Sequence, residues 1–314
     1  MKAIRIHEDG GPEVLRYEDV PDPEPADGEV LIELRAASLN HLDIWIRKGL
    51  PSVPKPRILG ADGAGVIAGT DERVVINPGI VSGGMTHIVG ETMDGTHAEL
   101  IAIPRDFVHP IPGDLSFEEA AAFPLVFETA YRMLAHRARL QAGEWVLIWG
   151  IGGGVATAAF EIARAIGAKT LVTSGSDAKL ETARSWGADL AVPHAEAAAA
   201  AKELGGVDLV VETVGEATWK DSLAAVKAGG RVVVCGATSG PNPPAQLHRF
   251  WWKQLTVYGS TMGTREDFLG AYGLVRTGRA RVHVDSTFPL SEIRAAHERL
   301  EAGEQLGKIV LTIP

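Results

Sequence analysis

Short apolar runs alternate with helical segments from Trp145 to Ser260, and this alternation limits the possible folds more than any other feature of the chain. The runs that begin at Trp145, Asp208 and Arg231 are apolar almost throughout, which is typical of strands covered on both faces. Helices between such strands supply the crossovers that a parallel sheet needs. The pattern therefore predicts an α/β domain with a doubly wound parallel sheet. The expected strands are 145–149, 170–173, 189–192, 208–214, 231–235 and 255–260, and the expected helices between them are 154–167, 177–186, 195–204 and 216–227.

Residues 1–115 differ in character, because Gly and Pro separate short apolar runs there, as in a β-rich domain. Ser116 then follows as an expected helix N-cap, with Glu119 placed to complete a capping box. The segments expected after the parallel sheet are helices at 265–277 and 291–302 and a last strand at 308–313, which returns to the first domain.

The charge and composition of the chain exclude several classes of protein. The formal net charge is −10 and the pI is about 5.5, so nucleic acid is not an expected partner. The aromatic and basic segment 249–253 is better explained by a helix packed beside the last strand of the sheet. No apolar run approaches the roughly 18 residues of a membrane span, and Met1 leads directly into a strand pattern rather than a signal peptide. The single cysteine, Cys235, allows no internal disulfide and no zinc site of several cysteines. A cytoplasmic protein is therefore expected.

The turn after the first strand of the sheet contains Gly150, Gly152, Gly153, Gly154 and Val155. Glycines at such a turn let the backbone approach a pyrophosphate, which then faces the N–H groups that open the next helix. The spacing is closer to G-x-x-G-x-x-A than to G-x-G-x-x-G. A plain tight turn is the alternative, but the position between a buried strand and a helix favours a dinucleotide site.

The end of the second strand indicates which dinucleotide is bound. An NAD site usually carries an acidic residue there to hold the ribose 2′-hydroxyl. This chain has Ser174 and Ser176 instead, and its first carboxylate, Asp177, opens the next helix. Small hydroxyl side chains with Lys179 nearby suit a 2′-phosphate. The alternative makes Ser176 a helix cap and leaves Lys179 in solvent. We therefore expect NADP(H), with NAD(H) as the alternative.

The motifs that identify a family are 25–30 (PADGEV), 40–49 (NHLDIWIRKG), 59–65 (LGADGAG), 94–99 (DGTHAE), 128–131 (ETAY), the glycine turn, 212–215 (ETVG) and 307–311 (GKIVL). Together they resemble the medium-chain dehydrogenase/reductases, and among these the zinc-free NADPH:quinone oxidoreductase-like members, over nearly the whole chain. The resemblance implies a GroES-like β-rich catalytic domain of residues 1–120 and 262–314. It also implies a Rossmann NAD(P)-binding domain of residues 121–261.

Zinc members of the family hold a catalytic metal with three residues, and the resemblance implies that this chain lacks all three. It has Asn40 in place of a Cys, Ala61 in place of a His, and Leu125 in place of a Cys or Asp. Leu42 stands where those members carry a hydroxyl proton relay. The structural zinc lobe has no counterpart either, because residues 80–87 contain no cysteine. No metal is therefore expected.

The resemblance also suggests roles for side chains. Asn40 is the expected hydrogen-bond donor to the oxygen of the acceptor, with an ordinary loop amide as the alternative. Asp43 is the second residue of segment 40–49 that we group with the catalytic residues. It is expected to orient this segment rather than to act as a base. Trp45 either lines the acceptor pocket or belongs to the core. The cofactor contacts expected from the resemblance and from strand ends are His41, Thr129, Val214, Cys235, Gly236, Ala237, Ser260, Thr261, Met262 and Lys308. For His41 the alternative is a solvated loop histidine.

Without a metal, an alkoxide has no Lewis acid to stabilise it, so oxidation of a simple alcohol is disfavoured. A quinone or an α,β-unsaturated carbonyl delocalises the arriving charge onto oxygen, where a few hydrogen-bond donors suffice. We therefore expect hydride transfer from NADPH to such a small electrophilic acceptor. The alternatives are a metal-free alcohol dehydrogenase and a non-catalytic NADPH-binding redox sensor. The resemblance further implies a homodimer, paired through the edge strand at 255–260.

Overall fold

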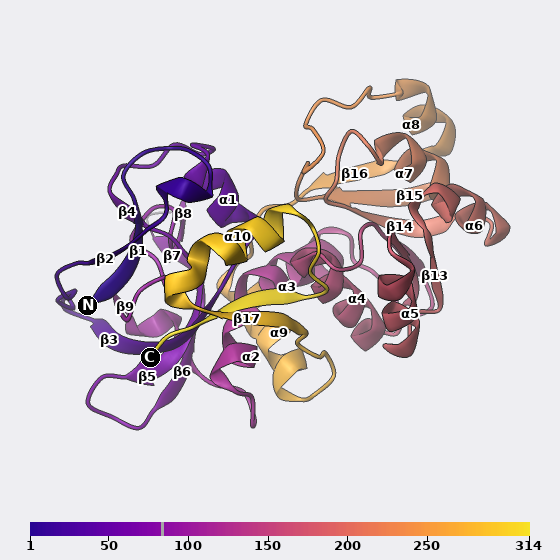
Figure 1. Cartoon of the computed structure of the whole chain (residues 1–314). Coiled ribbons are helices and arrows are strands. Elements are labelled where there is room, and N and C mark those ends of the chain that lie inside the picture. Colours follow the sequence, from indigo (N-terminus) through magenta and orange to yellow (C-terminus); the bar gives the residue numbers. More distant parts are fainter. Residues whose placement is uncertain (83–84) are drawn as a thin grey trace. The chain divides into compact units, whose positions relative to one another are not determined.

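The computed structural model describes residues 1–82 and 85–314, and the chain forms two compact units (Figure 1). Unit 1 contains residues 1–125 and 282–314, and unit 2 contains residues 126–281. Unit 1 is rich in strands and unit 2 is built on a parallel sheet. The predicted fold class, a GroES-like domain with a Rossmann domain, is therefore confirmed.

Within the described part of unit 1, seven strands form the main sheet, in the order β10 (Val108–Pro110), β6 (Arg73–Ile76), β5 (Asp62–Ile67), β3 (Glu29–Ser38), β18 (Lys308–Thr312) and β17 (Val284–Pro289), with β9 (Leu100–Pro104) also paired to β3. The last strand of the chain thus lies beside β3 and pairs antiparallel with it, as predicted. The smaller sheets are β2 (Arg16–Asp19), β1 (Lys2–Ile6) and β4 (Arg57–Ile58), and the pair β7 (Gly79–Ser82) and β8 (Met85–Ile88). Gly83 and Gly84, in the segment where a structural zinc lobe was considered, lie outside the described residues.

The helices of unit 1 pack on this sheet or close its ends, and they are α1 (His41–Arg47), α2 (Phe117–Ala121) and α10 (Ile293–Glu301). The predicted capping box opens α2: the Ser116 hydroxyl accepts from Glu119 N at 3.2 Å, and the Glu119 carboxylate accepts from Ser116 N at 2.9 Å. Helix α10 turns Ile293, Ala296 and Leu300 into the same apolar core as the strands. Both ends of the chain therefore contribute to one core.

Six parallel strands form the sheet of unit 2, in the order β13 (Leu190–Pro193), β12 (Lys169–Ser174), β11 (Trp145–Ile148), β14 (Val207–Glu212), β15 (Val226–Val234) and β16 (Thr256–Gly259). The helices that accompany them are α4 (Gly154–Ile166), α5 (Asp177–Ser185), α6 (Ala197–Glu203), α7 (Trp219–Ala225) and α8 (Leu247–Lys253). The first strand, β11, lies inside the sheet, and the chain adds strands first on one side of it and then on the other. This is the predicted doubly wound topology. Among the described residues, no helix has the length and apolar character to cross a membrane.

Helix α7 begins three residues later than predicted, because the Glu212 side chain holds the preceding residues in a turn. Its carboxylate accepts from the N–H groups of Val214 and Gly215 at 2.9 and 3.0 Å. It also accepts from the Thr218 hydroxyl at 2.8 Å and the Ser222 hydroxyl at 2.5 Å. These contacts occupy the backbone that a longer helix would use. The turn therefore replaces the first part of the predicted helix.

The boundary between the units after β16 also differs from the prediction, which assigned residues from 262 onward to the GroES-like domain. Helix α9 (Arg265–Arg276) belongs to unit 2 and packs on α4. Its buried Asp267 accepts from Arg132 Nη1 at 3.1 Å and pairs with His136. Both partners lie on a π-helical turn, Arg132–Arg137, that continues α3 (Pro124–Tyr131). The sequence gives no periodic signal for such an ion pair, so the boundary could not be placed from pattern alone.

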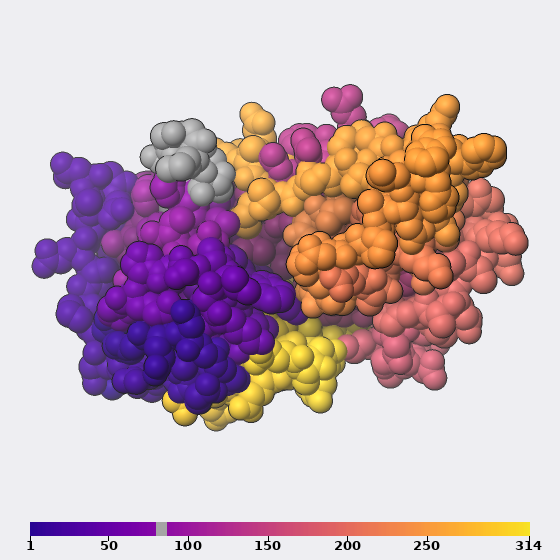
Figure 2. All heavy atoms as spheres, turned by 90° about the horizontal axis from the view of Figure 1, so that it is seen from above, coloured from indigo at the N-terminus to yellow at the C-terminus, as the bar shows by residue number. Residues whose placement is uncertain are grey.

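The aromatic segment 249–253 forms part of α8, but it packs less completely than predicted. The Phe250 ring lies 6.5 Å from the Trp219 ring and is tilted by 36° to it, and Lys253 Nζ donates to the carbonyls of Leu223, Ala224 and Val226. Trp251 and Trp252 instead remain 67% and 84% exposed. Figure 2 shows the orange part of the chain that includes α8 at the surface of its unit. Only one face of α8 is therefore covered by its own unit.

Replacement Glu212→Gln tests how much the turn after β14 stabilises unit 2. The amide keeps the size of the side chain but replaces an accepting oxygen by a donor, so buried N–H and hydroxyl groups lose a partner. We expect the free energy of unfolding of unit 2 to fall by about 1–3 kcal/mol, measured by urea unfolding. The exposed Glu203→Gln is the matched control and is expected to unfold like the wild type. Equal stability of both variants would contradict this account.

Candidate active site

Asn40 lies in the short connection between β3 and α1, and Asp43 holds that connection in place. The Asp43 carboxylate accepts from Asn40 N at 2.7 Å and from Gly60 N at 3.0 Å. Burial raises the pKa of Asp43 to about 7, while the Asn40 N–H and the Lys308 charge lower it. Asp43 thus links the backbone at Asn40 to that at Gly60, and the orienting role expected for it stays a prediction.

The side-chain amide of Asn40 is buried and bonded on both sides. Its Nδ2 donates to Asp62 Oδ2 at 2.8 Å, and its Oδ1 accepts from Lys308 Nζ at 2.5 Å. Lys308 Nζ also bonds Asp62 Oδ2 at 3.1 Å, which closes a three-membered network. Asn40 is 4% exposed and Lys308 5% exposed. We refer to Asn40, Asp62 and Lys308 as the polar cluster.

Asp62 is the centre of the polar cluster, and it was missed by the sequence analysis. Besides Asn40 and Lys308, its carboxylate accepts from the Ser38 hydroxyl at 3.1 Å and from Leu125 N at 2.8 Å. Asp62 directly follows Ala61, the position that the resemblance assigns to a zinc ligand. This neighbouring position was the signal in the sequence that could have identified Asp62. The three positions that the resemblance assigns to zinc ligands, Asn40, Ala61 and Leu125, therefore lie at or next to one carboxylate.

This arrangement does not fit a zinc ion. Zinc needs three or four Cys, His or carboxylate ligands. The Asp62 carboxylate already has four hydrogen-bond donors, one of them an ammonium, and Ala61 and Leu125 have no ligating side-chain atom. Within residues 1–82 and 85–314, no three His, Cys, Asp or Glu residues are grouped as a metal site would require. A cation at this place would have to displace Lys308.

The other residues expected on this side are arranged around α1. His41 is the first residue of α1 and is exposed, whereas Trp45 on the same helix is half-buried. Leu42, at the position that the resemblance assigns to a proton relay, packs against the apolar core of unit 1. Lys308 was expected beside the cofactor from the resemblance. Its two hydrogen-bonded partners in the polar cluster are both in unit 1.

The glycine turn of unit 2 has the geometry of a phosphate cradle. Gly150 and Gly152 have φ values of +67° and +129°, which favour glycine. Helix α4 begins at Gly154, and its N-cap, Gly153, has no side chain to satisfy the free N–H groups. A Cβ at Gly150 would meet no atom within 4 Å, and a Cβ at Gly153 only the Gly150 carbonyl oxygen, at 3.8 Å. The turn, continuing through Val155 into α4, therefore fits a dinucleotide pyrophosphate.

At the end of β12, the serine hydroxyls take part in local hydrogen bonds. The Ser174 hydroxyl accepts from Ser176 N at 3.1 Å, and the Ser176 hydroxyl caps α5 by accepting from Lys179 N at 3.5 Å. His194, which the sequence analysis missed, follows the neighbouring strand β13 and bonds the Thr173 hydroxyl at 2.9 Å. Its ring lies 3.7 Å from a Cβ built at Gly175. Position after a parallel strand was the signal that could have identified it.

Further expected contacts follow the carboxyl ends of the strands of unit 2, where open α/β sheets bind ligands. The buried Ser260 hydroxyl follows β16 and has no hydrogen-bond partner among the described residues. Thr129 is buried in α3. The remaining expected residues at strand ends are Val214 after β14, Cys235, Gly236 and Ala237 after β15, and Thr261 and Met262 after β16.

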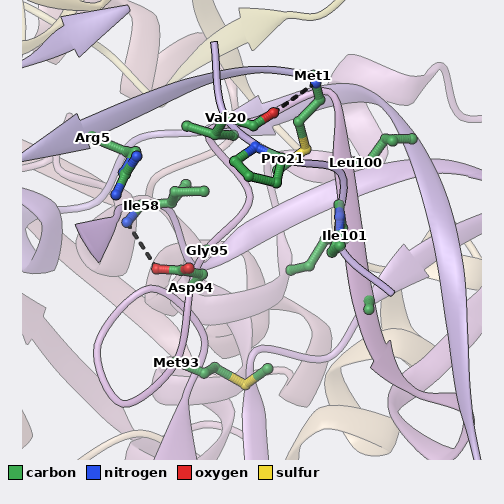
Figure 3. Close-up of a pocket in the computed structure, with 12 residues that line it drawn as sticks. Met1, Arg5, Val20, Pro21, Ile58, Met93, Asp94, Gly95, Leu100 and Ile101 are labelled. Atoms are coloured by element: carbon green, nitrogen blue, oxygen red, sulfur yellow. Dashed lines mark hydrogen bonds between the residues drawn. The ribbon is translucent and has the colours of Figure 1, made fainter. Parts of the chain in front are cut away.

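A cavity of about 270 Å³ in unit 1 has a different character (Figure 3). Its lining shares no residue with the polar cluster. Arg5, one of its charged side chains, pairs with Glu18 at 3.3 Å. The other, Asp94, accepts from Ile58 N at 3.0 Å. Most of the other lining residues are apolar, so this cavity offers no group for hydride chemistry.

Replacement Gly153→Leu tests the phosphate cradle. Gly153 has an ordinary φ of −70° and open space around its Cβ, so the variant should fold normally. Its side chain would occupy the approach of the pyrophosphate, and we expect the Kd of the dinucleotide to rise at least about 10-fold, measured by fluorescence titration. Gly273→Leu, on helix α9 with open space around its Cβ, is the control. Unchanged dinucleotide binding by the Gly153 variant would contradict this assignment.

Comparison with known proteins agrees with both units. The family model described as alcohol dehydrogenase GroES-like domain matches residues 26–113, and the one described as zinc-binding dehydrogenase matches residues 154–276. The quinone oxidoreductase of Lama guanicoe is 34% identical over 328 residues, which cover 100% of this chain and 98% of the relative. The acryloyl-coenzyme A reductase of Metallosphaera sedula is 30% identical, covering 99% of this chain and 100% of the relative.

A solved structure described as an NAD-dependent alcohol dehydrogenase is 36% identical and superposes with a TM-score of 0.96, covering 100% of both chains. Full-length relatives at this identity, together with both domain matches, establish the family. The chain therefore belongs to the medium-chain dehydrogenase/reductase superfamily, in its quinone oxidoreductase-like branch, and is an NAD(P)H-dependent oxidoreductase.

Proposed function

We propose that this enzyme reduces a quinone or an α,β-unsaturated carbonyl with NADPH and without a metal ion. The observation that carries the proposal is the buried Asn40 amide, bonded on one side by Lys308 and on the other by Asp62. It supplies a fixed hydrogen-bond donor in the segment whose zinc ligand is lost. The relatives described as a quinone oxidoreductase and an acryloyl-coenzyme A reductase support the proposal. A quinone and an acryloyl thioester both contain a carbon–carbon double bond conjugated to a carbonyl.

The reaction needs few groups from the protein. NADPH, when bound, supplies a hydride, which is two electrons and one hydrogen nucleus. The negative charge that this leaves on the acceptor oxygen is stabilised by an N–H group of Asn40. A proton from water then completes the hydroquinone or the saturated carbonyl product. No group of the chain has to act as a Lewis acid in this scheme.

The preference for NADPH over NADH rests on the end of β12. Ser174 and Ser176 provide hydroxyls and backbone N–H groups at the strand end, and the first carboxylate, Asp177, belongs to the start of α5. Lys179 on the first turn of α5 adds a positive charge near this helix N-terminus. A 2′-phosphate is stabilised by such a combination, whereas a carboxylate at the strand end would repel it.

A metal-free alcohol dehydrogenase is the second candidate, favoured by the 36% identity to the NAD-dependent alcohol dehydrogenase structure. It would have to stabilise an alkoxide with hydrogen bonds alone, because the relay position that the resemblance implies holds Leu42, an apolar side chain packed against the core. A redox sensor that binds NADPH without turnover is a further alternative.

We also propose a homodimer formed through strand β16, in a cytoplasmic protein. The outer edge of β16 has no neighbouring strand among the described residues, and Val257 on it is 37% exposed. An uncovered apolar edge strand invites pairing with a second copy. The exposed Trp251 and Trp252 of α8, which packs on the adjacent strand β15, would extend the same surface.

Steady-state assays with a panel of small quinones, enones and alcohols distinguish these functions. We expect NADPH oxidation with quinones or enones, unchanged after dialysis against a strong chelator. Loss of activity in chelator with recovery on zinc addition would contradict the metal-free mechanism. Faster alcohol-dependent NAD(P)⁺ reduction would favour the second candidate, and tight NADPH binding without any turnover would favour the sensor.

Replacement Asn40→Ala should lower kcat for the preferred acceptor by about 10- to 100-fold, because the acceptor oxygen loses its donor. Asn77→Ala changes a buried asparagine elsewhere in unit 1 and serves as the control for loss of a buried amide. A kcat for the Asn40 variant within twofold of the wild type would refute the role of this amide.

Replacement Lys179→Met should raise the Kd of NADPH about 10-fold and leave the Kd of NADH unchanged, because only NADPH carries the 2′-phosphate. The exposed Lys202→Met on α6 is the control, with both values unchanged. Isothermal titration with both dinucleotides gives the comparison. Equal weakening of NADPH and NADH by Lys179→Met would show that the preference has another origin.

Light scattering at micromolar concentration should give a mass twice the 33.3 kDa of the chain. Val257→Asp places a charge on the edge of β16 and is expected to yield a monomer. Leu269→Asp, at an exposed apolar position of α9, is the matched control and should remain dimeric. A wild-type mass equal to that of a single chain would rule out this interface.

A further inference from the structure

The position of Lys308 follows from the way the last strand enters unit 1. Gly307 precedes it with a φ of +113°, and Lys308 N donates to His283 O at 2.9 Å as β18 begins. Strand β18 then runs beside β3, and Leu39 N donates to Ile309 O at 3.0 Å. The first side chain of β18 is thereby brought to the end of β3, where Asn40 follows.

The partners of the Asn40 amide determine its orientation without ambiguity. An ammonium can only donate, so Lys308 must face the oxygen Oδ1 of the amide, and an ionised carboxylate can only accept, so Asp62 must face the nitrogen Nδ2. A flipped amide would turn two donors toward each other and two acceptors toward each other. The nitrogen carries two hydrogens, and Asp62 takes one of them. The direction of the other is then fixed as well.

Lys308 also changes the strength of this remaining donor. A hydrogen bond from an ammonium to the amide oxygen draws electron density toward that oxygen, which makes the N–H groups of the same amide better donors. The effect is greatest where water is excluded, and all members of the polar cluster are buried. Burial also lowers the pKa of the nearby His97 to about 3, with Lys308 as a contributor, so His97 remains neutral there.

We infer that Lys308 is a positioning residue for the electron acceptor, acting through the amide of Asn40, and is not a ligand of the dinucleotide. The inference rests on the proposed function for its kinetic part. Lys308 sets the direction and the donor strength of the Asn40 N–H, and Asp62 fixes both partners. This assigns the residue to the acceptor side of the reaction, whereas the family resemblance had suggested a contact with the cofactor.

Kinetic comparison of Lys308→Met, Asn40→Ala and the double variant tests this inference. For Lys308→Met we expect kcat to fall about 10- to 100-fold with the Kd of NADPH within about twofold of the wild-type value. The double variant should be no slower than Asn40→Ala, because both changes remove the same interaction. Lys55→Met is the matched control: Lys55 is a largely buried lysine of unit 1 paired with Asp9, and both parameters should be unchanged.

Two outcomes would overturn the inference. If Lys308→Met raised the Kd of NADPH but kept a normal kcat at saturating NADPH, Lys308 would be a cofactor contact. If the decreases in kcat of the two single variants multiplied in the double variant, Lys308 would not act through Asn40. Because Lys308→Met leaves Asp62 unpaired in the interior, folding is checked by circular dichroism. If that variant does not fold, Lys308→Met combined with Asp62→Asn removes both charges together and serves in the same comparison.

A spectroscopic measurement tests the same point independently of activity. The chain contains three asparagines, Asn40, Asn77 and Asn242, so protein labelled with ¹⁵N-asparagine gives three side-chain NH₂ signal pairs. Asn40→Ala identifies one pair by its loss. We expect Lys308→Met to shift that pair and to speed its hydrogen exchange, with the Asn77 and Asn242 pairs unchanged. An Asn40 signal pair that does not shift in Lys308→Met would refute the inference. Failure of the wild type to reduce any acceptor would refute only the proposed function, because the NMR measurement does not depend on activity.

Discussion

The buried carboxylate of Asp62 is the constraint around which the start of α1 and the end of the chain are organised in unit 1. A carboxylate in the interior is costly unless donors surround it, and this one accepts from Ser38, Asn40, Leu125 and Lys308. These donors come from the end of β3, the connection to α1, the start of α3 and the start of β18. The need to satisfy one anion thus draws together segments that are far apart in the chain.

A metal site gathers negative and neutral ligands around a cation, whereas this chain gathers donors around an anion and includes its own cation among them. The charge of Lys308 is covalently attached and cannot be exchanged or removed by a chelator. Its position is set by the pairing of β18 with β3 rather than by ligand geometry. The place of the Lys308 ammonium in the cluster is therefore set by the main-chain pairing of the sheet.

The sequence predicted the parts of the fold that depend on periodicity. Apolar patterns predicted the six strands of unit 2 and the helices between them, and the structure contains them. It also shows the expected pairing of the last strand with unit 1. The sequence could not predict features that depend on single buried polar side chains. Glu212 shortens α7, and Asp267 draws α9 into unit 2. Asp62 was missed for the same reason, since one acidic residue in a glycine-rich motif gives no sign of the four donors that it collects.

The discontinuity of unit 1 gives the molecule an order of assembly during its synthesis. Residues 126–281 emerge from the ribosome as one continuous stretch and can pack their parallel sheet while the last residues are still being added. In contrast, β3 can pair with β18 only after the end of the chain has been synthesised. Asp62 and Asn40 also lack the Lys308 ammonium until then. A nascent chain therefore acquires its nucleotide-binding turn before its polar cluster. Only a chain completed through Lys308 contains both the glycine turn and the polar cluster.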